Sequence, residues 1–265
     1  MAFADFGESN QTSEGRTRMK NHIAMVAALT GFAIAVPSAN AGTTVFSTEF
    51  DSSIPVEIVA GGNADLAGVQ GFAGLGPAGN QFGGSFLRSA TANVVTLTLA
   101  NLPAHTAINL DFLFAAIDSL DGTGSFPQGD FFRVTLDGVE MFRESFANAL
   151  ESQTQSYSPS SPELVLARRV ALGFTAGGPE SYYSDSAYNL GADARFGDWA
   201  HSASSAVITF QIEGPGIQPL SDESWAMDNL SVSVTPVPEP ESYAMMLAGL
   251  GLLGFVARKQ RGGAK

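Results

Sequence analysis

Short runs of alternating apolar and polar residues, separated by turn-forming residues, restrict the fold of this chain more than any other feature. Residues 94–100 alternate cleanly, and residues 107–114 place large apolar side chains on one face and polar side chains on the other. A period of two is that of a β-strand with one buried face. Within residues 131–142, two such runs flank Asp137-Gly138, a sequence typical of a tight β-hairpin turn.

Similar runs recur between residues 43 and 234, and the segments between them are rich in Gly, Ser, Thr and Asn. They predict about eight to ten short strands. Residues 60–80 are expected to be a long loop with at most one short strand, and residues 177–199 another long loop. Residues 164–174 are expected to be a strand pair or a short helix, with strand favoured. The expected fold is therefore all-β, an antiparallel β-sandwich of jelly-roll type. No repeat of fixed period is visible, which argues against a propeller or a solenoid.

The N-terminal segment has the character of a targeting signal. Met19 and a lysine precede the apolar residues 23–36, and an Ala-Asn-Ala sequence then ends at Ala41. A basic start, an apolar middle and an Ala-x-Ala end are the three parts of a secretory signal peptide. We therefore predict a signal peptide region at residues 1–41, with the true start at Met19 and export through the Sec machinery. A short buried helix is the alternative.

The C-terminal segment has three ordered parts. Pro238-Glu239-Pro240 precedes an uncharged apolar segment, residues 243–257. A basic cluster follows, made of Arg258, Lys259 and Arg261. Such a segment stops in a membrane with its basic end on the cytoplasmic side. As a helix, the apolar residues span about 22 Å, less than the bilayer core of about 30 Å. We expect residues 237–265 to hold a short transmembrane helix that anchors the chain transiently, with residues 42–236 as the ectodomain. A C-terminal core helix is the alternative.

The charge of the ectodomain limits its partners. Residues 42–236 contain six arginines, no lysine and 21 acidic residues. Such a surface repels nucleic acid and anionic lipid and attracts divalent cations. The chain has no cysteine, so an exported domain must be stable without disulfides. A bound metal ion is one alternative means of stabilisation.

The three-part C-terminus resembles the PEP-CTERM sorting signal of Gram-negative bacteria. The resemblance rests on Pro238-Glu239-Pro240, the apolar segment and the basic cluster, and it covers about the last thirty residues. It implies an inner-membrane-anchored intermediate, recognition by an exosortase, and a final location at the cell surface or in the extracellular matrix. Proteins with this signal are typical of bacteria that produce extracellular polysaccharide, so a structural or adhesive role in the biofilm matrix is expected.

The ectodomain resembles extracellular jelly-roll modules such as MAM-type domains and carbohydrate-binding modules. The resemblance rests on residues 48–51 at the start, 225–232 at the end and 118–131 in the middle. It implies a β-sandwich in which the first and last strands are neighbours.

Five acidic residues are candidate calcium ligands, since Ca²⁺ prefers six to eight hard oxygens from carboxylates and carbonyls. Pairing of the first and last strands, which the resemblance implies, would bring Glu49 and Asp228 together. Asp118, Asp121 and Asp130 lie in one predicted loop. The alternative is that Glu49 and Asp228 accept backbone N–H bonds or cap turns, and that the loop aspartates are solvated.

Four aromatic residues in the second predicted loop suggest glycan binding: Tyr182, Tyr183, Tyr188 and Trp199. Aromatic faces beside carboxylates and amides suit the C–H faces and hydroxyl groups of sugars. The favoured alternative is that these rings cover a sheet edge or fill a small apolar cluster. A lectin-like module is therefore a rival to the structural role.

Residues suited to catalysis are sparse. There is no thiol nucleophile, only His105 and His201 remain after the signal peptide, and no nucleophile elbow, HExxH sequence or phosphate-binding loop is present. Paired carboxylates in a glycoside hydrolase are the remaining enzymatic alternative. We expect a protein that is not an enzyme.

Overall fold

The computed structural model describes residues 42–123, 129–174, 184–215, 217–238 and 240–262. The chain divides into two compact units, Met1–Ser38 and Ala39–Lys265. The first unit lies outside the described residues, as does the predicted signal peptide region, residues 1–41. Every described strand lies between residues 43 and 236.

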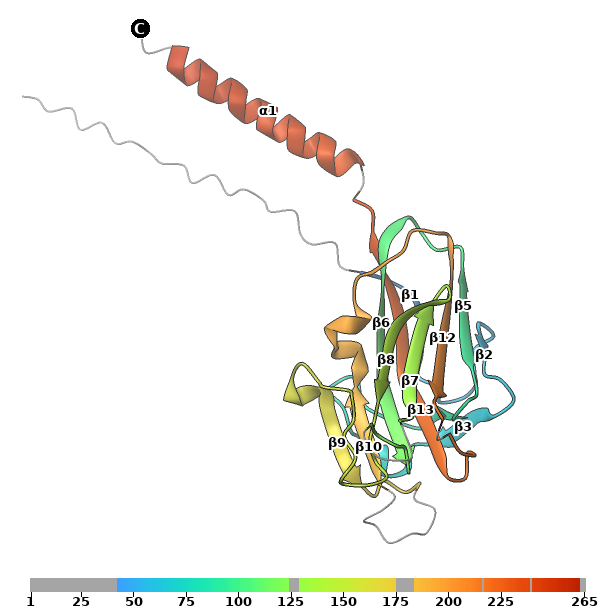
Figure 1. Ribbon diagram of the computed structural model, residues 1–265. Helices are drawn as coiled ribbons and strands as arrows, with labels where there is room; N and C mark the ends of the chain where they lie inside the picture. The colour runs from blue at the N-terminus through green and yellow to red at the C-terminus, as the bar shows by residue number, and fades with distance from the viewer. Residues whose placement is uncertain (1–41, 124–128, 175–183, 216, 239, 263–265) are drawn as a thin grey trace, which may run out of the picture. The chain divides into compact units, whose positions relative to one another are not determined.

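Two antiparallel sheets pack face to face, which confirms the predicted all-β sandwich (Figure 1). The larger sheet consists of β1 (Thr43–Thr48), β3 (Ala64–Gly68), β4 (Ser85–Ala90), β6 (His105–Asp118), β9 (Val165–Val170), β10 (Asp185–Asn189), β11 (Trp199–Ala200) and β13 (Glu223–Pro236). Its strand order is β3-β4-β13-β6-β10-β9, with β1 paired to β13 and β11 to β6.

The smaller sheet consists of β2 (Ile58–Val59), β5 (Val95–Ala100), β7 (Phe131–Leu136), β8 (Val139–Ser145) and β12 (Ser205–Glu213), in the order β2-β5-β12-β7-β8. The predicted hairpin at Asp137-Gly138 joins β7 to β8, and both of these residues have positive φ, as a type I′ turn requires. The helical elements are η1 (Gln70–Phe72), η2 (Pro162–Leu164), η3 (Leu190–Ala192), η4 (Ala194–Phe196) and α1 (Pro240–Gly262).

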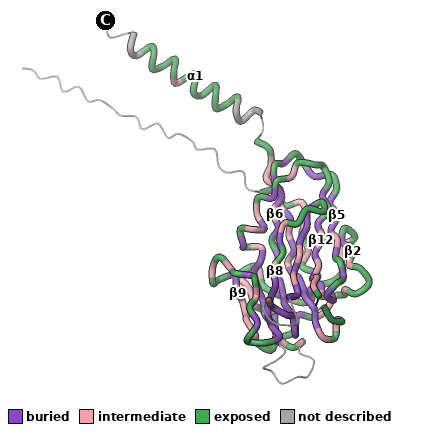
Figure 2. The backbone as a smooth tube through the Cα atoms, viewed as in Figure 1, coloured by how far each residue is buried: buried purple, intermediate pink, exposed green. Residues whose placement is uncertain are grey.

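The main apolar core lies between the two sheets. On β6, the alternating residues Ile108, Leu110, Phe112 and Phe114 point into this core, as the period of two predicts. Leu97 on β5 lies in the same core. Figure 2 shows buried residues along the central strands and exposed residues at many of the connecting loops. Each fully buried side chain of this size contributes about 1.5–3 kcal/mol relative to an exposed one.

A second apolar cluster covers the outer face of the larger sheet. Leu113 and Ile117 of β6 point away from the main core and pack with Phe72 from the glycine-rich segment after β3. Gly71 in that segment donates its N–H to Leu172 O at 2.8 Å. A Cβ atom at Gly71 would lie 2.7 Å from the same oxygen, so a larger residue does not fit. The end of β6 is therefore buried on both faces.

Strand β10 and the first residue of β11, Trp199, lie where the sequence predicts a loop. Within residues 177–199, β10 pairs with both β6 and β9, and all five of its residues are buried. Its sequence, Asp-Ser-Ala-Tyr-Asn, has no apolar alternation, so local pattern gave no signal for it. Residues 164–174 were interpreted as strand, and the structure confirms this for β9, Val165–Val170. The short helix η2 ends at Leu164, directly before β9.

The pairing of β6 with β13 places the candidate ligands. These two strands are antiparallel, with Glu223 opposite Asp118 and Pro236 opposite His105. The start of β13 therefore lies beside the end of β6. On the other side of β13 lies β1, and Thr48 of β1 is opposite Leu230 of β13. The first and last strands are therefore neighbours, as expected.

The C-terminal apolar residues form α1, where a short transmembrane helix was expected within residues 237–265. In the described part of the chain, no helix is both long enough and apolar enough to cross a membrane.

Candidate functional site

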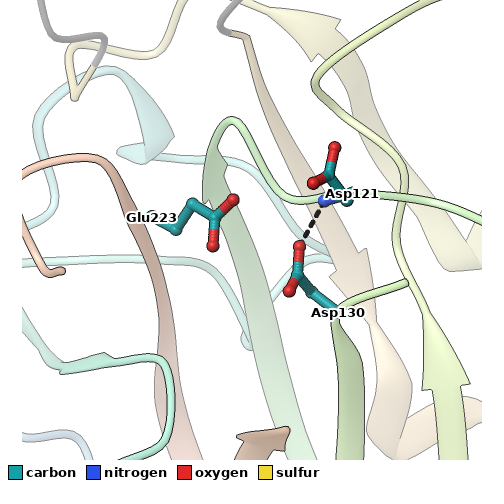
Figure 3. Close-up of side chains that lie close together, drawn as sticks. All are labelled: Asp121, Asp130 and Glu223. Carbon is teal, nitrogen blue, oxygen red and sulfur yellow. Dashed lines mark hydrogen bonds between the residues drawn. The ribbon is translucent and has the colours of Figure 1, made fainter. Parts of the chain in front are cut away.

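Three buried carboxyl groups meet at one end of the sandwich. Asp121 follows β6, Asp130 immediately precedes β7, and Glu223 is the first residue of β13. Their exposed fractions are 2%, 1% and 0%. One carboxylate oxygen from each lies within 4.8 Å of the others, and the three groups face one another (Figure 3). We call these three residues the acidic triad.

The hydrogen bonds of the triad leave two oxygens unused. Asp121 Oδ1 accepts a hydrogen bond from Gln153 Nε2 at 2.7 Å, and Asp130 Oδ2 accepts one from the backbone N–H of Asp121. The Gln218 backbone N–H and Nε2 donate to the two Glu223 oxygens, both at 3.1 Å. Asp121 Oδ2 and Asp130 Oδ1 are buried and have no hydrogen-bond partner among the described residues. Buried polar atoms are nearly always paired, so these two call for a ligand or a proton.

The triad resists ionisation. Burial, together with the charges of neighbouring carboxyl groups, raises the pKa of Asp130 to about 7 and that of Glu223 to about 8. Burial also raises the pKa of Asp121, although the hydrogen bond from Gln153 opposes this shift. No salt bridge from Lys, Arg or His reaches the triad within the described residues. Near neutral pH the triad therefore favours a bound proton or a bound cation.

The remaining predicted ligands lie elsewhere. Asp118 is buried at the end of β6, and its backbone N–H donates to Asp185. Strand pairing does bring Glu49 near Asp228, where the charge on Glu49 contributes to raising the pKa of Asp228 to about 7, after burial and Asp51. Both Asp228 oxygens, however, accept backbone N–H bonds, at 3.1 and 2.8 Å, as the alternative interpretation of this residue expects.

Sequence reasoning placed Asp121 and Asp130 in one loop but missed Glu223. Glu223 is far from both aspartates in the sequence, and only the pairing of β6 with β13 brings it near them. The one local signal is an acidic residue at the start of the last strand, two residues before the buried Trp225.

Of the four aromatic residues considered for sugar binding, the two that the structure describes are buried, in agreement with the favoured alternative that the rings pack within the protein. Tyr188 is 0% exposed and packs against Phe146, and Trp199 is 4% exposed. Their rings fill the main core because β10 and β11 belong to the larger sheet. Tyr182 and Tyr183 lie outside the described residues.

A polar hollow of about 580 Å³ lies beside β1 and β13 on the larger sheet. Asn229 Nδ2 donates to Asn80 Oδ1 at 2.8 Å, and Asn80 Nδ2 donates to Asp111 Oδ1 at 3.5 Å. A neighbouring hollow of about 450 Å³ shares Asp111 and Ser231 with it. We call these two hollows the polar groove. Its carboxylate, amide and hydroxyl groups suit a ligand with many hydroxyl groups.

The chain was compared with curated proteins and with solved structures. No curated protein matches the chain. Among solved structures, the N-terminal CBM22-1-CBM22-2 tandem domain from Paenibacillus barcinonensis Xyn10C is 11% identical to this chain, with a TM-score of 0.35. The match covers 76% of this chain and 49% of the tandem domain, so this chain spans about half the length of the tandem domain. The family 35 carbohydrate binding module from Clostridium thermocellum is 12% identical, with a TM-score of 0.30 and coverage of 72% and 100%.

The family description that matches is the PEP-CTERM protein-sorting motif, at residues 236–261. The matched residues begin at the end of β13 and include Pro238-Glu239-Pro240, α1 up to Arg261, and with it the basic cluster. The chain thus carries a PEP-CTERM sorting motif, the mark of an exosortase-sorted surface protein, directly after an antiparallel β-sandwich.

Proposed function

We propose that this protein is a structural or adhesive component of the extracellular matrix of a polysaccharide-producing Gram-negative bacterium. The observation that carries the proposal is the position of the sorting motif. The motif begins at Pro236, the residue at which the last strand of the sandwich ends. The sandwich is therefore the cargo that the exosortase system delivers, and its task is performed outside the cytoplasm.

The placement of the histidines supports a non-enzymatic role. His105 Nε2 and His201 Nδ1 lie 2.7 Å apart, and their outer ring nitrogens contact Pro103 O and Asp137. Each ring nitrogen is thereby engaged by the protein itself. The acidic triad is buried, so a polysaccharide chain has no access to its carboxyl groups as a glycoside hydrolase requires.

Sorting is tested by changing the motif and not the sandwich. Replacing Pro238-Glu239-Pro240 with three alanines should leave the chain in the membrane fraction with residues 258–265 still attached. Glu241→Ala, which changes a neighbouring acidic residue outside the Pro-Glu-Pro sequence, is the matched control and should be sorted normally. Mass spectrometry of the wild-type surface form should find residues 258–265 removed. An intact tail on that form would overturn the sorting step.

The matrix role is tested separately, in the native host. Deleting the gene should reduce the mass or cohesion of the biofilm without reducing the amount of polysaccharide secreted, and re-expression of the wild-type chain should restore it. Re-expression of the alanine variant of the sorting motif is the matched control and should not restore it. Unchanged biofilm mass and cohesion in the deletion strain would refute the structural role while leaving the sorting result intact.

A second candidate function is carbohydrate binding in the polar groove. The hydrogen-bonded series Asn229, Asn80 and Asp111 offers donors and acceptors on an open surface. Retention of the protein on purified matrix polysaccharide should fall in an Asp111→Ala variant. Thr98→Ala, an exposed polar position on the smaller sheet, is the control and should be retained like the wild type. Equal retention of both variants would exclude the groove.

A further inference from the structure

We propose that Asp121, Asp130 and Glu223 bind one hard divalent cation, which joins the segment between β6 and β7 to the start of β13. The ligand class is that of Ca²⁺, and CaCl₂ is the probe that tests it. This inference does not depend on the proposed matrix role.

The separation of the carboxylate oxygens suits Ca²⁺. Two oxygens that bind one Ca²⁺ at about 2.4 Å can be no more than about 4.8 Å apart. One oxygen from each triad residue meets this limit. Mg²⁺ binds at about 2.0–2.1 Å, so its ligands lie closer together, and it is reluctant to lose its water shell in a buried site. The three carboxylates supply part of the six to eight oxygens that Ca²⁺ takes, and second carboxylate oxygens and water complete the set.

The unused oxygens distinguish the triad from an ordinary acidic cluster. Asp121 Oδ2 and Asp130 Oδ1 belong to side chains that are at least 98% buried, and neither oxygen has a hydrogen-bond partner among the described residues. Figure 3 shows the three carboxyl groups close together, with one oxygen of Asp130 hydrogen-bonded to the Asp121 N–H. A proton shared between two of the carboxyl groups would neutralise only one negative charge. A cation both neutralises the charge and occupies these two oxygens.

The charges around the triad favour the same conclusion. The neighbouring charges that act on Glu223 are those of Asp130, Asp121 and Asp222, which are all carboxyl groups. Such repulsion between carboxylates is relieved by a bound cation. Asp228 also has acidic neighbours, Asp51 and Glu49, but both of its oxygens already accept backbone N–H bonds, so neither is left unused.

A cation in the triad would act as a cross-link. Asp121 and Asp130 flank the connection from β6 to β7, whereas Glu223 begins the strand that lies between β4 and β6. The ion would thus tie the two sheets together at one end of the sandwich. The chain has no cysteine, so a disulfide cannot perform this task. Because a cation that binds only the folded state stabilises it, the domain should gain stability after export, where Ca²⁺ is more concentrated than in the cytoplasm.

Calorimetric titration with CaCl₂ tests the proposal on the exported full chain, purified in chelator and then freed of it. The wild type should bind Ca²⁺ and show a higher melting temperature with CaCl₂ than with EDTA. Asp130→Asn should bind one Ca²⁺ fewer, or bind at least about tenfold more weakly. Its amide oxygen can still accept the Asp121 N–H, so the variant keeps the local hydrogen bond.

Asp228→Asn is the matched control, since Asp228 is equally buried and also has a raised pKa. It should lose no triad-bound Ca²⁺. If Asp130→Asn does not fold, Asp121→Asn replaces it, because its amide oxygen can keep the bond from Gln153. Absence of Ca²⁺ binding by the wild type would overturn the proposal. The proposal would also be overturned if the triad variant bound as many Ca²⁺ ions as the wild type, and as tightly. That conclusion would hold whether or not Asp228→Asn weakens binding.

Discussion

Replacing Asp130 with asparagine should reduce the pH dependence of stability when a chelator is present. Burial, with a smaller contribution from the charge of Asp121, raises the pKa of Asp130 from 3.8 to about 7. Because the pKa is higher in the folded protein than in the unfolded chain, the folded state holds this proton more tightly. The resulting stabilisation is complete below about pH 4 and is lost as the pH rises through about 7.

The expected loss is large enough to measure. A pKa difference of about 3 between the folded and unfolded states corresponds to about 4 kcal/mol in the free energy of unfolding. About two-thirds of it, about 3 kcal/mol, falls between pH 5 and pH 8. Domains are stable by about 5–15 kcal/mol in total. Asp130 is only 1% exposed, so screening by solvent reduces this figure little.

Urea denaturation in EDTA at pH 5 and pH 8 provides the measurement. Trp199 and Trp225 are both buried, so their fluorescence reports unfolding. The wild type should lose about 3 kcal/mol more than Asp130→Asn over this interval. Removing the Asp130 charge also lowers the pKa of Glu223, so the stability of the variant should depend still less on pH. Parallel losses in the two proteins would refute the reasoning, because the Asp130 proton would then not be linked to folding.

Three further changes test the packing. Phe112→Ala removes a side chain that is 0% exposed and should lower the free energy of unfolding by about 3–5 kcal/mol, measured with urea. Gly71→Ala forces a Cβ atom to 2.7 Å from Leu172 O and should destabilise the protein by about 1–3 kcal/mol, with faster hydrogen exchange in the glycine-rich segment as the specific sign. Arg195→Ala leaves the buried carboxylate of Asp193 without its 2.7 Å partner and should cost about 2–3 kcal/mol, an effect that unchanged urea midpoints would contradict.

Local pattern predicted much of the fold. The alternation in β5, β6 and β12 appears in the structure as one buried and one outward face over much of each strand. The turn at Asp137-Gly138 joins β7 to β8 as predicted. These features depend on neighbours in the sequence, so the sequence alone reveals them. β10 escaped prediction because its polar residues are buried by pairing with β6 and β9, which no local pattern encodes.

The candidate site divides in the same way. The excess of acidic residues and the lack of cysteine are properties of composition. They indicated that a bound cation could stabilise the domain in place of a disulfide. Which carboxyl groups meet was decided by strand pairing. The antiparallel register of β6 and β13 brings Glu223 to Asp121 and Asp130, and leaves Asp118 outside the triad. Burial of Tyr188 likewise follows from its strand and not from its residue type.

The sequence by itself determined the route of this protein, because a sorting motif is a linear signal that is read in the order of its residues. It also determined the all-β class, because a period of two is a local property of the chain. The tertiary structure alone decided which polar groups are buried together. That outcome depends on contacts between residues far apart in the sequence, and it converts three ordinary acidic side chains into a candidate cation site.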